Sequence, residues 1–399
     1  MTRETAQRIS SIDLLRGIAV LGILIMNIQS FTMPGSAYIN PTAYGDLSGI
    51  NKWVWILSHL FADTKFMSLF SILFGAGIIL LTDKLKATQR PVRKIWYSRI
   101  IWLFIFGFLH MLLIWAGDIL MMYAICGFYA FLFKNRTTKF LIRLAIILFI
   151  IPISIEAFQG SSWSYFPDEA KDQVLAAWSP SDEKISEQVE YINAASYSQS
   201  ISYRIEDYLG LFFYHFVPEG FWRILSMMLF GMYFYKRGII TASKEAGFYK
   251  KWIMIFLPLG LLFVICGLIY NFNNQWQLPE SMFYGATFNY IGSLFMAVTY
   301  MCIVMLWSQS EILSSAKELL QKVGKMAFTN YILTSLICFL FVFITNLFGG
   351  IERIYQFMMT LIVWSILLLF TQLWNKSFRM GPLEWLWRSL TYWKWAKIK

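Results

Sequence analysis

Residues 11–31 read SIDLLRGIAVLGILIMNIQSF, an apolar stretch of helix length with three polar interruptions. The hydrocarbon core of a bilayer is about 30 Å thick, so roughly 20 apolar residues cross it as a helix. Similar runs recur along all 399 residues, of which 58% are hydrophobic and 14% charged. Soluble domains carry roughly 25% charged residues. The sequence therefore predicts an all-α, polytopic membrane protein.

The apolar runs predict about ten transmembrane helices. They cover residues 12–33, 54–82, 98–116, 119–134, 140–158, 219–237, 251–271, 284–307, 325–347 and 353–374. Lysine and arginine gather after the second, fourth and sixth spans and in the C-terminal tail. Basic loops remain in the cytoplasm, so we expect both termini there. This distribution explains the net charge of +11 without a nucleic-acid partner.

The chain divides into two predicted halves. We expect an N-terminal five-helix half over 1–158, an extracytoplasmic acidic loop over 159–205, and a C-terminal five-helix half with a cytoplasmic amphipathic tail over 206–399. Two segments with apolar residues at helical spacing, 53–66 and 202–221, predict amphipathic helices at the outer interface. No cleavable signal peptide is evident.

The four cysteines lie inside apolar segments without metal-ligand spacing. We therefore expect small buried residues rather than disulfides or metal ligands.

Polar residues inside a span are costly and usually face a partner or a cavity. Asp13 and Arg16 are three residues apart, on one face of the first helix and at its cytoplasmic mouth. They form either a structural ion pair or a site where Arg16 holds an anionic group. Asn27 lies about 16 Å deeper, at 1.5 Å per residue. It makes either an interhelical hydrogen bond or a contact to a ligand.

Two histidine–aspartate pairs lie in the predicted outer half. His59 and Asp63 are four residues apart near the start of the second span, and His110 precedes Asp118 in a tight outer turn. A neutral histidine oriented by a carboxylate is a suitable general base. The alternative for His110 is a hydrogen-bonded packing residue.

Several motifs resemble the YeiB-like family of bacterial membrane proteins, whose function is not established. They are SIDLLRGIAVLGILIMN, ADTKFMSLFSILFGAG, FLHMLLIWAGDIL, GKMAFTNY and RMGPLEWLWRSLTY. That family is similar to a wider transmembrane acyltransferase superfamily, which includes heparan-α-glucosaminide N-acetyltransferase and sugar O-acyltransferases. The shared first helix has the pattern D-x-x-R-G-x-A, matched here by Asp13, Arg16, Gly17 and Ala19.

The chain departs from these relatives at the catalytic histidine. Sugar O-acyltransferases usually have a histidine 11 residues after the motif arginine, where this chain has Asn27. The lysosomal N-acetyltransferase also has an asparagine there, with its catalytic histidine in the following loop. Residues 34–50 contain no histidine, so that role does not transfer. His59 is the nearest in sequence, and His110 offers a different solution.

The resemblance implies a multi-pass protein of the bacterial plasma (inner) membrane that moves an acyl group from cytoplasmic acyl-CoA to a sugar or lipid acceptor at the outer face. The candidate catalytic residues are His110, Asp118, Asn27, Asp63 and His59. The candidate acyl-CoA-binding residues are Arg16, Arg93, Lys94 and Arg99. Acyl-CoA would be a co-substrate, and no covalently bound cofactor or metal is expected.

Two other functions fit the same residues. One is a transporter or exporter of a small anionic or amphiphilic molecule, and the other is a non-catalytic membrane protein. The small residues Gly75, Gly77 and Gly107 also permit a homodimer.

Overall fold

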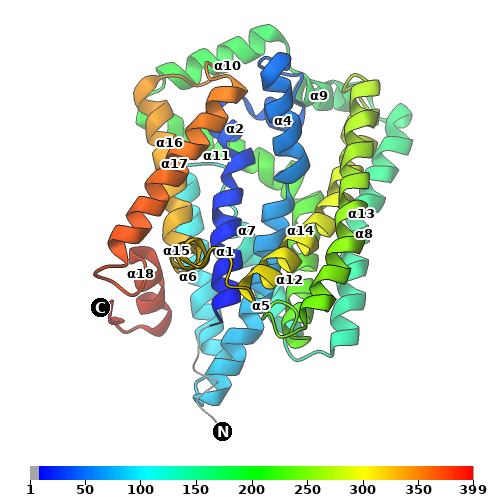
Figure 1. The fold of residues 1–399 in the computed structure, drawn as a ribbon. Coiled ribbons are helices and arrows are strands. Elements are labelled where there is room, and N and C mark those ends of the chain that lie inside the picture. Colours follow the sequence, from blue (N-terminus) through cyan, green and yellow to red (C-terminus); the bar gives the residue numbers. More distant parts are fainter. Residues whose placement is uncertain (1–8, 399) are drawn as a thin grey trace.

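A computed structural model describes residues 9–398, and no β-strand occurs in this part of the chain. Most of the long helices run side by side as one bundle (Figure 1). By length and composition, eight helical segments can cross a membrane. They are Ser10–Thr32, Gly49–Ala87, Val92–Leu113, Thr138–Tyr165, Ala246–Asn273, Glu280–Ser308, Ala327–Thr345 and Arg353–Trp374. The molecule is thus helical and apolar, as a membrane protein should be.

The helices are labelled in chain order. They are α1 (Ser10–Gly22), α2 (Leu24–Thr32), α3 (Gly35–Ile39), α4 (Gly49–Phe61), α5 (Lys65–Ala87), α6 (Val92–Leu113), α7 (Leu120–Ala130), α8 (Thr138–Ser162), α9 (Asp168–Trp178), α10 (Asp182–Ala194), α11 (Tyr197–Leu211), α12 (Phe221–Lys236), α13 (Ala246–Asn273), α14 (Ala286–Ser308), α15 (Ser314–Lys325), α16 (Ala327–Thr345), α17 (Arg353–Trp374) and α18 (Pro382–Tyr392). Wide π-helical turns, Phe212–Gly220 and Glu280–Gly285, lead into α12 and α14.

Eight of the ten expected spans correspond to the eight long apolar segments. The expected spans 119–134 and 219–237 are helical too, but shorter. The first is Leu120–Phe133, and the second is α12, which has 16 residues. Because α12 is buried along most of its length, its neighbours rather than lipid surround it.

The acidic segment 159–205, the expected connection between two spans, is folded mainly into α9, α10 and the first half of α11. Two serines begin these helices, because Ser181 accepts a hydrogen bond from the Lys184 amide and Ser196 accepts one from the Gln199 amide. Such N-caps are strong local helix signals. These local signals are independent of the acidic composition of the segment.

The basic segments gather at one end of the bundle. The Lys86 ammonium contacts Asn135, and the Lys236 ammonium donates to the carbonyls of Lys134 and Arg136, 2.8 and 2.7 Å away. Arg90 lies over the ring of Tyr392 in the tail. These contacts bring together the four segments that the charge pattern assigned to one side.

The segments poor in basic residues meet at the opposite end. Asn40 donates to the Trp178 carbonyl at 3.2 Å, and Asn193 donates to the Phe348 carbonyl at 2.9 Å. Figure 1 shows α9 and α10 across this end, with α18 near the other.

Glycines hold α5 and α12 in backbone contact. A Cβ added to Gly75 would lie 1.9 Å from the Met228 carbonyl oxygen, and one on Gly231 would lie 1.9 Å from that of Ile72. Gly107 meets Met121 and Asp118 in the same way. Gly75 and Gly107 therefore both serve close contacts within the chain. Only Gly77 of the three has open space beside it.

A second pair of glycines explains part of the first-helix motif. A Cβ on Gly17 would lie 2.0 Å from the Leu320 carbonyl oxygen, and one on Gly324 would lie 1.8 Å from that of Asp13. The motif glycine thus lets α15 press against α1 beside the Asp13–Arg16 pair.

We expect Gly75→Ala to destabilise the protein by about 1–3 kcal/mol, because its methyl group overpacks the α5–α12 contact. Gly77→Ala, two residues further along α5, should be neutral or slightly stabilising, since alanine favours helix over glycine. Thermal unfolding of the purified protein in detergent compares the two variants. Equal midpoints for both would contradict the proposed contact.

Candidate functional site

His110 and Asp118 form a buried dyad. His110 lies in the last turn of α6, and Asp118 lies in the connection to α7. The His110 Nδ1 is 2.8 Å from one Asp118 carboxylate oxygen, and the other oxygen accepts the Met121 amide at 2.9 Å. The sequence left open whether Asp118 reaches His110, and the fold of this turn brings them together. Asp118 thus both accepts an amide from the first turn of α7 and orients the imidazole.

The second ring nitrogen of His110 has no hydrogen-bond partner among the described residues, although it is buried. An ionised Asp118 favours the tautomer with the proton on Nδ1, which leaves a lone pair on Nε2. The ring lies near Tyr331 and Trp115, with centroids 5.2 and 6.3 Å away. A neutral imidazole oriented in this way has the geometry that general-base catalysis requires.

Helix α11 covers the dyad at the end of the bundle away from the basic segments. Arg204 donates to the Leu112 carbonyl at 3.0 Å, and Tyr197 donates to the Leu113 carbonyl at 2.9 Å. Tyr208 packs with Met121 at the start of α7. These contacts use the free carbonyls at the end of α6. His110 is consequently only 3% exposed.

Asn27 lies on the same side of the bundle as the dyad. Phe31, one turn further along α2, stacks on Trp115 at 4.4 Å between ring centroids, and Trp115 in turn lies edge-on to His110. Residues four apart share a helix face. The Asn27 side chain is half-buried and makes no hydrogen bond within residues 9–398. Asn27 therefore shares a helix face with Phe31, but no hydrogen bond joins it to His110.

A second polar cluster, which we call the Lys65 cluster, forms where α4 ends and α5 begins. The helix breaks at Ala62–Thr64, and Thr64 has a left-handed φ of 59°. The break brings His59 Nδ1 to 3.0 Å from Asp63. Asn289 of α14 donates to Asp63 at 2.8 Å and accepts from the fully buried Lys65. One amide thus satisfies an acid and a base together.

Arg223 of α12 completes the Lys65 cluster. It pairs with Glu219 at 2.9 Å, donates to Ser68 and Ser293, and lies over the ring of Tyr290. It is 1% exposed. Helices α5, α12 and α14 therefore each contribute to one network. The contributing residues lie near the start of each helix, after the break at Ala62–Thr64 and the two π-helical turns.

Two buried tyrosines, close enough to act on each other electrostatically, lie near the dyad and the Lys65 cluster. Tyr331 beside His110 accepts the Ile119 amide at 3.4 Å, and the Tyr123 hydroxyl donates to the Met67 carbonyl at 3.1 Å and contacts Ser71 at 3.3 Å. Ser71 is one turn beyond Ser68, which binds Arg223.

The expected anion-binding residues divide into two groups. Arg16 pairs with Asp13 at 3.0 Å, and Arg99 lies 3.5 Å from the ring of Trp387 in α18. Arg16, Arg99 and Arg388 are close enough to act on one another electrostatically. Arg93 and Lys94 are exposed on the outside of α6. Arg16 and Arg99 thus lie near each other, while Arg93 lies near Lys134.

The tail is fixed to the bundle through Glu384. Its carboxylate accepts the Phe328 amide at 2.7 Å, the Thr329 amide at 3.1 Å and the Thr329 hydroxyl. Burial raises the pKa of Glu384, while these donors lower it. The Glu384 carboxylate thus caps the start of α16. This contact gives the glutamate of the GPLEWLWRSLTY motif a structural role.

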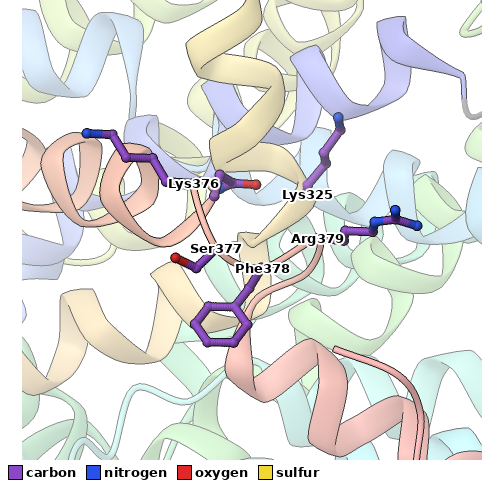
Figure 2. Close-up of a pocket in the computed structure, with 6 residues that line it drawn as sticks. Lys325, Lys376, Ser377, Phe378 and Arg379 are labelled. Atoms are coloured by element: carbon purple, nitrogen blue, oxygen red, sulfur yellow. The ribbon is translucent and has the colours of Figure 1, made fainter. Parts of the chain in front are cut away.

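A cavity of about 360 Å³ lies nearby, between the end of α15 and the connection from α17 to α18. Figure 2 shows its cations Lys325, Lys376 and Arg379 pointing away from one another. The cavity is therefore basic, but these side chains do not converge on one point.

Sequence reasoning missed Asn289 and gave Lys65 no role. Asn289 lies more than 200 residues from Asp63, its partner. The available signal was an amide within an apolar span, which usually has a polar partner. No group of three or more histidine, cysteine or acidic side chains in residues 9–398 is arranged to hold a metal ion.

We expect Asn289→Leu to destabilise the protein by about 1–3 kcal/mol or more, because it leaves the buried Asp63 and Lys65 each without one partner. The control is Asn274→Leu, since Asn274 bonds only its own helix at the end of α13. Unfolding midpoints of both variants in detergent test this. A loss no larger than that of the control would contradict the network.

The chain is similar to a protein family and to two bacterial proteins. Residues 234–394 match the family described as "Protein of unknown function (DUF418)". The chain is 29% identical to the uncharacterized protein YeiB of Escherichia coli (strain K12) over 391 residues, which is 96% of each protein. It is also 29% identical to the uncharacterized protein YxaH of Bacillus subtilis (strain 168) over 412 residues, 99% of this chain and 96% of YxaH.

No solved structure matches the chain. The two full-length similarities and the matched C-terminal region support the YeiB-like family that the motifs indicated.

Proposed function

We propose that this protein is a membrane acyltransferase of the superfamily its first helix resembles, with His110 as general base. The observation that carries the proposal is the dyad: a buried imidazole oriented by Asp118 whose second nitrogen has no partner in the described chain. The proposal requires a multi-pass protein of the bacterial inner membrane with both termini in the cytoplasm. The gathering of basic segments at one end supports that orientation.

The proposed reaction transfers an acyl group from acyl-CoA to a hydroxyl or amine. His110 Nε2 takes the proton of the acceptor as its oxygen or nitrogen attacks the thioester carbonyl. The carbon–sulfur bond then breaks, and the CoA thiolate receives the proton from His110. Asp118 stabilises the imidazolium that exists between the two proton transfers. Asn27 is the proposed donor to the oxyanion.

The donor would enter from the basic end. Arg16 and Arg99 would bind its phosphates, because arginines suit phosphate and are held here by Asp13 and Trp387. Arg99 and His110 belong to one helix, α6, and are about 16 Å apart along its axis. A long pantetheine arm can bridge that separation. Arg93 and Lys94 would contribute only to the surrounding positive field.

The acceptor would arrive from the opposite face. A sugar or lipid must pass α11 to reach the dyad, since Tyr197 and Arg204 tie that helix over the end of α6. Movement of α11 is thus part of the proposed cycle.

The test measures acyl-CoA binding and CoA release by the purified protein, with sugars and a lipid extract as acceptors. We expect His110→Gln to keep binding but slow CoA release by roughly 10²- to 10⁴-fold, the usual contribution of a general base. His215→Gln, a histidine outside the dyad, serves as control and should keep full activity. Arg16→Ala should weaken binding instead. A wild-type protein that binds no acyl-CoA would refute the enzyme.

A transporter of a small anionic or amphiphilic molecule is the second candidate. The broken helix at Ala62–Thr64, with Asp63 and Lys65 beside it, favours it, because discontinuous helices often form transport sites. The Lys65 cluster would then bind the substrate or carry protons, with His59 and Asp63 as its titratable pair.

Proteoliposomes distinguish this candidate from the enzyme. Proton-coupled transport predicts acidification or alkalinisation upon substrate addition, which Asp63→Asn abolishes while His110→Gln does not. Loss of acyl transfer through His110→Gln without any flux would instead exclude transport as the main function.

A further inference from the structure

A small cavity lies between α2, α4 and α17, at the end of the bundle away from the basic segments. Its polar lining consists of Gln29, Trp55, Ser58, Arg353 and Gln356. The cavity volume is about 10 Å³. That is room for the centre of about one water-sized species. The cavity is therefore suited to a single atom or a very small molecule.

Three side chains of this lining have buried polar atoms without a hydrogen-bond partner. They are the Gln29 amide oxygen, the Trp55 indole nitrogen and the Arg353 Nε. All three residues are nine-tenths or more buried, at 3%, 2% and 1% exposure respectively. Unsatisfied buried polar groups are rare because each costs about 1–3 kcal/mol. Three around one cavity indicate an occupant.

Arg353 determines the charge of that occupant. Its two terminal nitrogens donate to the backbone carbonyls of Pro41, Tyr44 and Asp46. Within residues 9–398, no carboxylate forms an ion pair with it at 4.0 Å or less. The guanidinium is thus a buried cation held by neutral groups. Such a charge is costly unless a counter-ion lies close.

The nearby acids are already used. Asp46 accepts from the Asn51 amide at 2.7 Å and the Ser48 amide at 3.0 Å, and Glu352 accepts from Asn51 at 3.0 Å. The hydrogen bond from Asn51 is the main reason that the pKa of Asp46 is lowered. The charge of Asp46 reaches Arg353 electrostatically, but its oxygens face Asn51 and Ser48. The cavity itself is lined by no acidic residue.

We propose that this cavity binds a small monovalent anion of chloride size. The Arg353 Nε–H, the Trp55 indole N–H and the Ser58 hydroxyl are the donors. The Gln29 amide can add a fourth donor when its oxygen and nitrogen exchange places, since the two ends are equivalent in shape. Its present nitrogen contact, 3.8 Å to the Met26 sulfur, is weak and easily given up.

The anion would join three elements at one point. Arg353 begins α17, Trp55 lies in α4 and Gln29 lies in α2. His59, part of the Lys65 cluster, stacks on Trp55 at 5.0 Å. By binding the Trp55 indole, the anion would therefore also help to fix the imidazole of His59, which Asp63 orients. This site does not depend on acyl transfer or on transport.

The test uses the full-length protein in detergent. Its unfolding midpoint is followed while sodium chloride replaces sodium gluconate at constant ionic strength, and then with sodium bromide. We expect a saturable rise of the midpoint with either halide. Trp55→Phe, which keeps the ring but loses the N–H, should shift half-saturation to several-fold higher halide.

The control is Trp96→Phe. Trp96 also has a buried indole nitrogen without a partner, but it packs on Phe131 at the far end of the bundle. It should leave the halide response unchanged. Equal shifts for both tryptophan variants would contradict binding in this cavity.

Diffraction at the bromine absorption edge from crystals grown in bromide locates the ion directly. The proposal expects an anomalous peak beside Arg353 Nε. The proposal would be overturned if the unfolding midpoint did not change with halide and the cavity held ordered water without a bromide peak.

Discussion

The backbone contact between α5 and α12 is the constraint on which the polar interior depends. Gly75 and Gly231 let these helices touch without side chains between them. Ser68 lies seven residues before Gly75 on α5, and Arg223 lies eight residues before Gly231 on α12. Arg223 donates a hydrogen bond to Ser68. Close approach thus allows Arg223 to reach partners on both α5 and α14. Larger residues at the glycines would separate the groups that neutralise one another.

The polar groups inside the bundle follow a common rule, in which nearly every charge is matched by a named partner. Asp118 is matched by His110 and a helix amide, and Asp63 by His59 and Asn289. Several buried polar atoms of the described chain lack a partner, and some of them belong to the two proposed sites. His110 Nε2 and the Arg353 side chain each keep a buried polar atom unpaired beside groups that are otherwise satisfied. A bound substrate or ion could form the hydrogen bonds that these atoms lack.

Much of the fold followed from sequence pattern alone. Apolar length predicted the long spans, and charge predicted which connections meet. Spacing of three or four residues predicted the Asp13–Arg16 and His59–Asp63 pairs, because such residues share a helix face. The His110–Asp118 contact needed the shape of a turn, which spacing does not give.

Other features depend on contacts between distant parts of the chain. Asn289 joins the Lys65 cluster, and Glu384 caps α16, only because the tertiary fold brings them there. The glycines at 75 and 107 look alike in sequence whether they serve a dimer or an internal contact. The cavity at Arg353 lies between α2, α4 and the start of α17, which follows about 300 residues later, so no local pattern marks it.

The central claim is that His110 acts on an acyl group delivered from the basic end. An electron cryomicroscopy structure of the protein with a non-hydrolysable acyl-CoA analogue tests it most directly. The account predicts the phosphates at Arg16 and Arg99 and the thioester mimic within reach of His110 Nε2. A bound analogue whose acyl end lies away from the dyad, or a protein that binds none, would contradict it.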